Sequence, residues 1–375
     1  MPITMQSTRR MPLRGRYTLS MRHAPCVVCI PAKNEAAHLP STLDALAKAF
    51  GRLPGHGAHR RGELVIALDA CTDHSRRVIE ARAKDFPVAI RIIDVPPHPV
   101  PHAGRVRRAA MEEGARAFPL DEVVLFTTDA DTRVHPDWLV NTLSHMNSAD
   151  FVCGDIWRDD ADGNVVRAPH EHHYHALHRL RRHIDPIAFD ANDPHPQGFG
   201  ASLAMRRDTY ISIGGCPDTP SDEDVTMVRA ARARGFRVRQ PRDVSVLTSS
   251  RRDGRATGGL AEALVREDED AARGQPVLLV DPRRYVELYH HSAALRTAFA
   301  QNDAQTIEAK ACQLQLDPLT LEEAWNTARS ADAFITQVLP EPSFTADLPL
   351  DRADRLLRRE EEQVYGRANA RVGAA

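Results

Sequence analysis

The sequence predicts an α/β fold, in which a doubly wound, mostly parallel sheet is flanked by helices and followed by a C-terminal helical subdomain. Short apolar, β-branched runs alternate with helical patterns of about a dozen residues over roughly the first 150 positions, as parallel βαβ units do. The chain has 375 residues, more than one hydrophobic core usually supports, so a second unit is expected. Beyond about residue 258 the pattern is almost wholly helical.

Composition limits the classes of protein to consider. Hydrophobic residues make up 42% and charged residues 27% of the chain, as in an ordinary globular protein. The net charge of -2 gives no global field that would favour nucleic acid. No window approaches the roughly 20 apolar residues that span a bilayer, and no signal-peptide pattern opens the chain. We therefore expect a cytoplasmic protein with no nucleic-acid partner and no transmembrane segment, although peripheral membrane contact stays open.

The chain divides into three parts by pattern. Residues 1–24 are Arg-rich and aperiodic, which predicts a disordered tail, with Met21 as an alternative start of translation. A main domain is expected over 25–257, with its two halves at 25–150 and 151–257. The helical subdomain takes 258–375.

The strands of the first half are expected in this order: 26–30, 63–69, 88–95 and 122–128. Helical patterns follow the first three strands, and the last of these helices begins at Gly104. Cys26 and Cys29 fit a CxxC pattern but lie within the first strand, where alternation sends them to opposite faces. They are therefore expected to be buried thiols rather than a disulfide or a zinc site.

The second half is less regular. Strands are expected at 151–157, after the glycines of 198–200, at 236–239 and at 244–248. A histidine-rich helix is expected at 169–183, and a further helix runs from Asp222 to its end at Gly235. Beyond 258, amphipathic runs predict four helices at 281–299, 304–316, 320–338 and 350–368.

Carboxylates follow the expected strands at the positions where ligands of open α/β sheets bind. The fourth strand ends in Asp129-Ala130-Asp131, and hard oxygen ligands of this kind suit Mg²⁺ or Mn²⁺ that complete their shell with substrate phosphates. An Asp-rich turn that caps the strand is the alternative. Glu35, Asp69 and the pair Glu223 and Asp224 occupy comparable positions.

The order of these acids and their surroundings resembles the family 2 glycosyltransferases with a GT-A nucleotide-diphospho-sugar transferase fold. Residues 31–35 look like the family's P-A-x-N-E loop, Asp69 to Asp73 like its D-x-x-T-D element, and Gly104 to Ala109 like its helix start with Gly and Ala. Further along, 129–131 is similar to the DXD motif, 200–202 to the acceptor-side loop and 223–224 to the E-D pair. The resemblance covers about residues 25–257.

The resemblance implies an enzyme, a hexosyltransferase-type glycosyltransferase that moves a sugar from a nucleotide-diphospho-sugar to a hydroxyl acceptor with inversion, metal assistance and no processivity. The half at 25–150 would bind the nucleotide-sugar, and the half at 151–257 the acceptor. The implied nucleotide-sugar residues are Pro31, Ala32, Asn34, Glu35, Asp69, Gly104, Arg105, Asp129, Ala130, Arg251 and Arg255. The implied acceptor residues are His195, Gly200, Ala201 and Ser202.

Asp131, with Asp129, would serve the metal ion, and Asp224 beside Glu223 would be the base that deprotonates the acceptor. Acids are also favoured in the first turn of a helix on dipole grounds alone, which is the alternative for Asp224. Arg251 and Arg255 would fork onto diphosphate oxygens, and Lys33, Arg105 and Arg108 are weaker candidates for the same task. The acceptor would be a small molecule, a glycan or a lipid-linked hydroxyl.

Several alternatives stay open. The second motif reads Asp69-Ala70-Cys71-Thr72-Asp73 where the family commonly has glycine, so the nucleotide base is unassigned. A retaining transferase, a sugar nucleotidyltransferase or a non-catalytic nucleotide-sugar-binding scaffold would share the fold. The histidines at 172–183 share helix faces that could hold zinc, but they carry no HExxH motif, so a polar lining is favoured.

Overall fold

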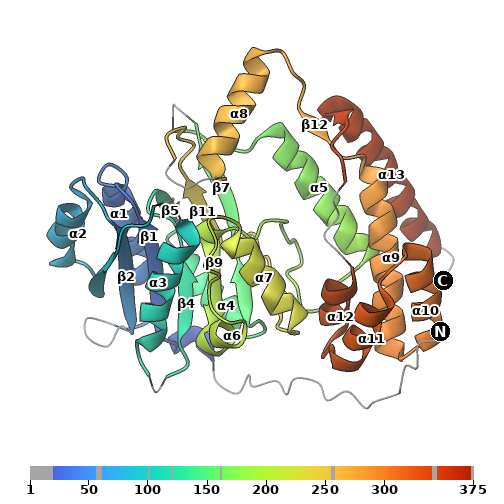
Figure 1. The fold of residues 1–375 in the computed structure, drawn as a ribbon, viewed down its shortest axis with the longest axis horizontal. Helices are drawn as coiled ribbons and strands as arrows, with labels where there is room; N and C mark the ends of the chain where they lie inside the picture. Colours follow the sequence, from blue (N-terminus) through green and yellow to red (C-terminus); the bar gives the residue numbers. More distant parts are fainter. Residues whose placement is uncertain are drawn as a thin grey trace.

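The computed structural model describes residues 20–55, 61–99, 102–119, 121–160, 163–254, 258–339 and 344–372. Figure 1 shows an α/β unit built from the first two thirds of the chain and a group of helices built from the last third. The long helix α5 (Pro169–Ile184) lies between the two parts. The expected fold class is confirmed.

The large sheet has seven strands in the order β10-β6-β9-β4-β1-β2-β3. Their bounds are β1 Cys26–Ala32, β2 Gly62–Asp69, β3 Ala89–Val95, β4 Val124–Thr127, β6 Phe151–Cys153, β9 Leu203–Arg206 and β10 Val238–Arg239. The four strands from the first half are parallel, and β9 is antiparallel to both of its neighbours. The carboxyl ends of the four parallel strands therefore meet at one edge of the sheet, which is where ligands bind in such folds.

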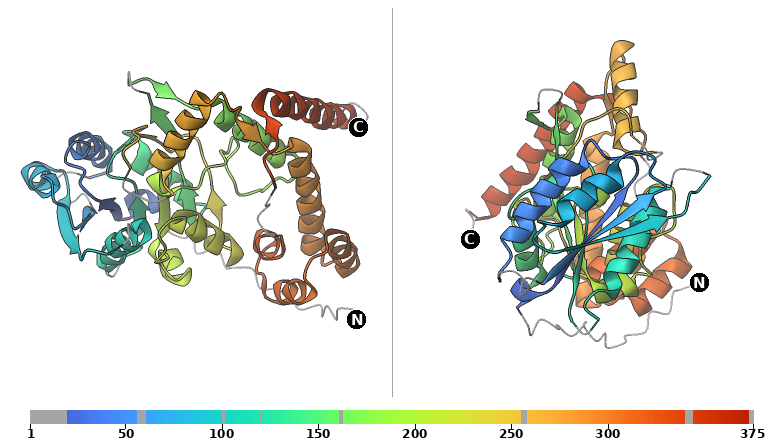
Figure 2. Two further views of the ribbon diagram at one scale, coloured as in Figure 1. Left: turned by 45° about the horizontal axis from the view of Figure 1, so that its top comes forward. Right: turned by 90° about the vertical axis from the view of Figure 1, so that its left-hand side faces the viewer.

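Helices cover both faces of this sheet, as Figure 2 shows. On one face lie α1 (Leu39–Gly51), α2 (Ser75–Ala83) and α4 (Trp138–Met146), in one core with Cys26, Val28 and Ile30. On the other lie α3 (Ala103–Arg116), α6 (Arg207–Ser212) and α7 (Glu223–Ala233), packed against Val27 and Cys29. The two cysteines are buried on opposite faces, as the alternation predicted.

A second sheet continues the chain directly after Asp131. The sequence patterns predicted strands at 151–157 and 244–248, which overlap two strands of this sheet, but they did not predict that these strands form a separate sheet. It has the order β5-β11-β7-β8, with bounds Thr132–Val134, Ser245–Thr248, Asp155–Asp159 and Val165–Val166. Antiparallel pairing of β5 with β11 places Thr132 opposite Thr248, and the two hydroxyl groups are 2.9 Å apart. The segment after Thr248 is thereby brought beside Asp131.

The helices of the last third are α8 Leu260–Ala272, α9 Pro282–Gln301, α10 Ala304–Leu314, α11 Pro318–Thr327, α12 Ala331–Val338 and α13 Leu350–Val372. A two-residue pair joins β12 (Leu278–Leu279) to β13 (Leu348–Pro349). The single helix expected over 320–338 is two helices, because Ala328 is extended and the Ser330 hydroxyl caps α12. Nowhere in the described chain is a helix both long enough and apolar enough to cross a membrane.

The amino-terminal boundary differs from the prediction. Residues 1–19 lie outside the described residues, but Met21–His23 forms a short helix and Met21 is buried in the main core. The Met21 backbone N–H donates to the side-chain oxygen of Asn147, the residue that follows α4. The disordered tail predicted up to residue 24 therefore does not include Met21, because its side chain fills the core.

A buried ion network ties α5 to the C-terminal helices. Asp185, at the end of α5, has no exposed surface and accepts hydrogen bonds from Arg296 of α9 at 2.7 and 3.1 Å. Arg296 also reaches Asp332 of α12 at 3.3 Å. Removal of one partner from such a buried pair is costly because the remaining charge is left without compensation.

We predict that Arg296→Met lowers the free energy of unfolding by about 3 kcal/mol, since Asp185 loses its counter-ion in the interior. Urea denaturation followed by circular dichroism measures the change. The matched control is Arg355→Met, which removes an i,i+4 pair whose side chains are 63% and 67% exposed and should change stability by less than about 0.5 kcal/mol. Equal loss in both variants would contradict the prediction.

Candidate active site

The loops that follow β1 and β2 are fastened to each other. Asn34 has a left-handed backbone conformation, with φ of 53°, and its side-chain oxygen accepts hydrogen bonds from the N–H groups of Thr72 and Asp73. The Asp73 carboxylate accepts from Ala36 N–H, and the Ser75 hydroxyl accepts from Glu35 N–H. The structure thus brings the two predicted motifs together, and it gives Asn34 a structural task within them.

Two cations neutralise the carboxylates at these loops. Lys33 pairs with Asp69 at 2.9 Å. Arg251, from the segment after β11, forks onto both oxygens of Glu35 at 2.8 and 2.5 Å, and it lies 3.0 Å from Asp131. Arg251 therefore joins the end of β1 to the end of β4, although it lies more than a hundred residues further along the chain.

The triplet at the end of β4 points its side chains in different directions. Ala130 is buried, and its carbonyl accepts from the Thr42 hydroxyl of α1 at 2.9 Å. The Asp129 side chain is 36% exposed, whereas that of Asp131 is 14% exposed. Burial raises the pKa of Asp131 to about 7, and the Asp129 charge adds to this effect while Arg251 opposes it. Burial and the neighbouring Asp129 thus both disfavour the charged form of Asp131.

Arg107 is the residue of this site that the sequence patterns missed. It lies on α3, is 5% exposed, and hydrogen-bonds to Glu223 and Asp129, each at 2.9 Å. Its neighbours Arg105 and Arg108 are the residues of this helix for which the sequence predicts a diphosphate contact. A signal was available: Arg107 is spaced with Gly104, Met111 and Gly114 on the face of α3 that is buried.

Asp224 lies in the first turn of α7, after Asp222, which has a φ of 60°. Its carboxylate accepts from the N–H groups of Gly200 at 2.6 Å and of Val225 at 2.7 Å. Burial raises its pKa, while Arg107 opposes the shift. The neighbouring Glu223 is buried and held by Arg107, so the two acids have different surroundings.

The predicted acceptor residues separate into two groups. Gly200 lies against Asp224, and the neighbouring Phe199 side chain is 50% exposed. Ala201 and Ser202 are buried, and the Ser202 hydroxyl accepts from the Trp138 indole at 3.0 Å. These two positions therefore pack the core and do not face a ligand.

His195 lies in the interior and not at the acceptor surface where the sequence analysis expected it. Its side chain has no exposed surface, with Nε2 3.0 Å from the Cys153 carbonyl and Nδ1 accepting from Gln197 N–H. Burial lowers its pKa to about 3, which keeps the imidazole neutral. The acceptor contact predicted for His195 is not available in this arrangement, because both ring nitrogens are used inside the protein.

The remaining candidates are placed as follows. Pro31 and Ala32 end β1, and Ala32 is buried. Gly104 packs on the 217–219 segment, where an added Cβ would come within 2.4 Å of the Thr219 carbonyl oxygen, so its lack of a side chain serves packing. Arg105 donates to the Pro96 carbonyl at 3.0 Å. Arg255 lies outside the described residues.

The histidines of α5 do not form a metal centre. His173 bonds to Asp354 of α13, and burial lowers the pKa of His175 to about 3. Across the described residues, no group of three or more His, Cys, Asp or Glu side chains is arranged to hold a metal by itself. A cation at Asp129 and Asp131 would therefore need ligands from a substrate and from water.

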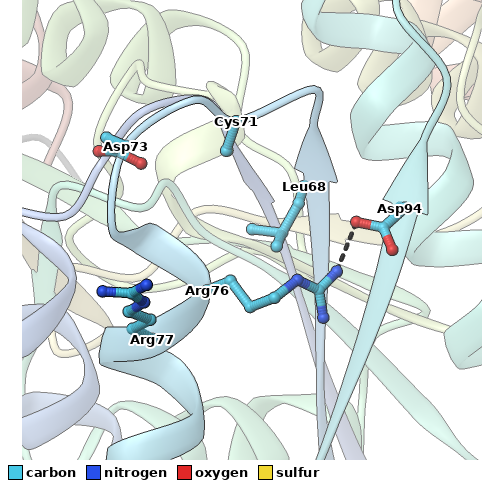
Figure 3. Close-up of a pocket in the computed structure, with 6 residues that line it drawn as sticks. All are labelled: Leu68, Cys71, Asp73, Arg76, Arg77 and Asp94. Carbon is cyan, nitrogen blue, oxygen red and sulfur yellow. Dashed lines mark hydrogen bonds and ion pairs between the residues drawn. The ribbon is translucent and has the colours of Figure 1, made fainter.

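A pocket lies beside the Asp69 to Asp73 motif, and Figure 3 shows the residues that line it. Its lining includes Cys71, Asp73 and the ion pair of Arg76 with Asp94. None of Glu35, Asp131 or Asp224 is part of this lining. This pocket is therefore separate from Glu35, Asp131 and Asp224.

The chain was compared with known proteins. The sequence model of glycosyl transferase family 2 matches residues 27–211. No curated protein matches the chain. Among solved structures, it is similar to S. aureus TarS 1-349, with 14% identity, coverage of 91% of this chain and 89% of that one, and a TM-score of 0.45.

Two further likenesses are of the same order. TarS 1-349 in complex with UDP-GlcNAc has 13% identity, coverage of 84% and 89%, and a TM-score of 0.46. Mannosyltransferase PcManGT from Pyrobaculum calidifontis, in complex with GDP-Man and Mn2+, has 18% identity, coverage of 88% and 89%, and a TM-score of 0.46. Likenesses this distant carry no argument about the chemistry of this chain.

The family match runs from β1 into α6, so it includes Glu35, Asp69 and the 129–131 triplet, while Asp224 and Arg251 lie beyond it. Residues 27–211 thus match a glycosyl transferase family 2 domain, and the chain is a glycosyltransferase.

Proposed function

We propose that this glycosyltransferase inverts the configuration of the transferred sugar, uses a divalent cation, Mg²⁺ or Mn²⁺, and transfers to a hydroxyl acceptor without processivity. The observation that carries the proposal is the convergence of two sets of acids. Asp129 at the end of β4 and Glu223 at the start of α7 both bind the guanidinium of Arg107. A donor held at one set would be adjacent to an acceptor held at the other.

On the donor side, Glu35 and Asp69 would accept from the nucleotide, because strand-terminal carboxylates can bind ribose hydroxyls or base N–H groups. Once the Arg251 side chain has left Glu35 and Asp131, it would bind the diphosphate. The neighbouring carboxylates Asp129 and Asp131 fit a divalent cation, since a bound cation would favour the charged form of Asp131, which burial and the Asp129 charge disfavour. Such an ion neutralises the charge that develops on a departing diphosphate.

On the acceptor side, Asp224 would take the proton from the hydroxyl as that oxygen attacks the anomeric carbon, and the carbon–oxygen bond to the diphosphate breaks on the opposite face. The N–H groups of Gly200 and Val225 orient the carboxylate for this task. The exposed ring of Phe199 adjoins the Gly200 contact, so we assign it to the acceptor surface. A small molecule, a glycan or a lipid-linked alcohol all offer the hydroxyl required.

The metal is tested by donor turnover on a panel of nucleotide-sugars, with and without EDTA. We expect EDTA to abolish turnover and Asp131→Ala to lower it by about 10²-fold or more in the presence of Mn²⁺, because the leaving diphosphate loses its counter-charge. Asp137→Ala is the control, since Asp137 is a partly exposed acid whose side chain does not cap α4. Full activity of Asp131→Ala in EDTA would exclude the metal's role.

The base is tested by Asp224→Asn, which we expect to lower kcat for transfer by about 10²- to 10⁴-fold. In the wild type, transfer should be lost as the pH falls through the Asp224 pKa. Because burial raises this pKa, the loss should be centred above the value of about 3.9 that is ordinary for Asp.

The control for Asp224→Asn is Asp222→Asn, because asparagine tolerates the left-handed conformation found at Asp222. NMR of the product reports the anomeric configuration. Retention of configuration, or a pH profile that Asp224→Asn leaves unchanged, would refute the assigned mechanism.

The acceptor surface is tested by Phe199→Ala. We expect the KM for the acceptor to rise by about two- to tenfold, since a lost aromatic contact weakens binding, while hydrolysis of the donor alone is unchanged. Ile211→Ala, at a 63% exposed position of α6, is the matched control. An unchanged acceptor KM in Phe199→Ala would show that the acceptor binds elsewhere.

A further inference from the structure

Arg107 connects parts of the chain that are far apart in sequence. Its Nε donates to Glu223 at 2.9 Å, Nη2 donates to Asp129 at 2.9 Å, and Nη1 donates to the Thr127 hydroxyl at 2.7 Å. Nη1 also donates to the Gly200 carbonyl at 3.1 Å. One side chain of α3 therefore bonds to the end of β4, to the triplet after it, to the 200–202 loop and to the start of α7.

The Gly200 loop is shaped to lie on this guanidinium. A Cβ added at Gly200 would come within 2.4 Å of Arg107 Nη2, so a side chain there would separate the loop from Arg107. Gly200 accepts from Arg107 through its carbonyl and donates to Asp224 through its N–H at 2.6 Å. Arg107 thus reaches the candidate base through a single peptide residue.

Only a guanidinium can make this set of bonds. Arg presents N–H donors along a rigid planar fork, so separate edges of the group can bind separate acceptors at fixed angles. Lys carries a compact ammonium that keeps the charge but cannot span the same acceptors. At 5% exposure, Arg107 has no surface available for a substrate.

We propose that Arg107 is a positioning residue that sets the placement of the donor-side Asp129 relative to the acceptor-side Glu223 and Asp224. The proposal rests on the function proposed above. Transfer requires the attacking oxygen and the anomeric carbon to meet at close range, and a misplacement of about 1 Å can cost about 10²-fold in rate. Donor binding alone makes no such demand, because it needs only the donor half of the site.

Arg107 also has an electrostatic effect on Asp224. The titratable groups that act with Asp224 are Glu223 on its own helix, Arg107 on α3, Cys216 before α7 and Cys153 on β6. Burial raises the pKa of each cysteine to about 12, so both thiols are neutral. Arg107 is the cation of this group, and its charge favours the deprotonated form of Asp224.

The test compares Arg107→Lys, Arg107→Met and the control Arg116→Met, which lies on the same helix at a 70% exposed position. Each purified variant is measured for Tm, for donor Kd, for kcat and KM of transfer, and for the pH profile of transfer. Arg107→Lys should keep the donor Kd within about twofold and lower kcat by about 10- to 100-fold. The acidic limb of its pH profile, where transfer is lost as the pH falls, should be unchanged. Arg107→Met should lower kcat and also move the acidic limb to higher pH, because the positive charge near Asp224 is gone.

These measurements distinguish a positioning role of Arg107 from a purely structural one. If Arg107→Met does not fold, Arg107→Lys carries the test, because it keeps the buried charge. A purely structural role would lower Tm and reduce donor binding and kcat together with the folded fraction, leaving the pH profile unchanged, and this would overturn the inference. Wild-type transfer rates in folded Arg107→Lys would also overturn it. A wild type with no transfer on any donor and acceptor would instead refute the proposed function, and the inference with it.

Discussion

Repulsion among carboxylates at one edge of the large sheet is the constraint on which the site depends. Glu35, Asp69, Asp131 and Glu223 are all shielded from solvent to a large degree, and such charges are tolerated only when cations compensate them. Lys33 serves Asp69, Arg251 serves Glu35 and Asp131, and Arg107 serves Glu223 and Asp129. Each of these arginines comes from an element other than those of its acids, so charge balance requires the elements to assemble correctly.

Arg107 and Arg251 differ in burial and in the groups that they bind. Arg107 is enclosed, with its side chain 6% exposed, and it is bonded on all sides by protein groups. Among the described residues, the guanidinium of Arg251 binds Glu35 and Asp131, which are the groups proposed above to engage a nucleotide and a divalent ion. Exchange of one cation for another at Glu35 and Asp131 is electrostatically cheap compared with the creation of an uncompensated buried charge. On the function proposed above, the site would combine one fixed arginine with one that ligands displace.

The C-terminal helices contribute to the fold through α5 rather than through the carboxylates. One side of α5 contacts α9 and α13 through Leu177 and Leu180, while Asp185 at its end binds Arg296. This arrangement explains three of the histidines that the sequence emphasised: His173, His175 and His178 are buried, and burial favours the neutral forms of the last two. His195 is also neutral because it is buried, and it bonds to the backbone carbonyl of Cys153 in β6.

Local patterns were enough to predict the parallel strands, because a strand buried on both faces must read as an apolar run, and β1, β2 and β4 do so. The same patterns predicted the acids at their ends and the opposite burial of Cys26 and Cys29. They did not predict the second sheet, the role of Arg107 or the burial of His195 and Ser202. Pairing of β5 with β11 is a contact between distant segments, and the environment of a side chain depends on such contacts rather than on its neighbours in sequence. The sequence alone determined which chemical groups are present and that the strand ends share one edge, whereas only the tertiary structure decided which charges neutralise one another, because that depends on distances across elements.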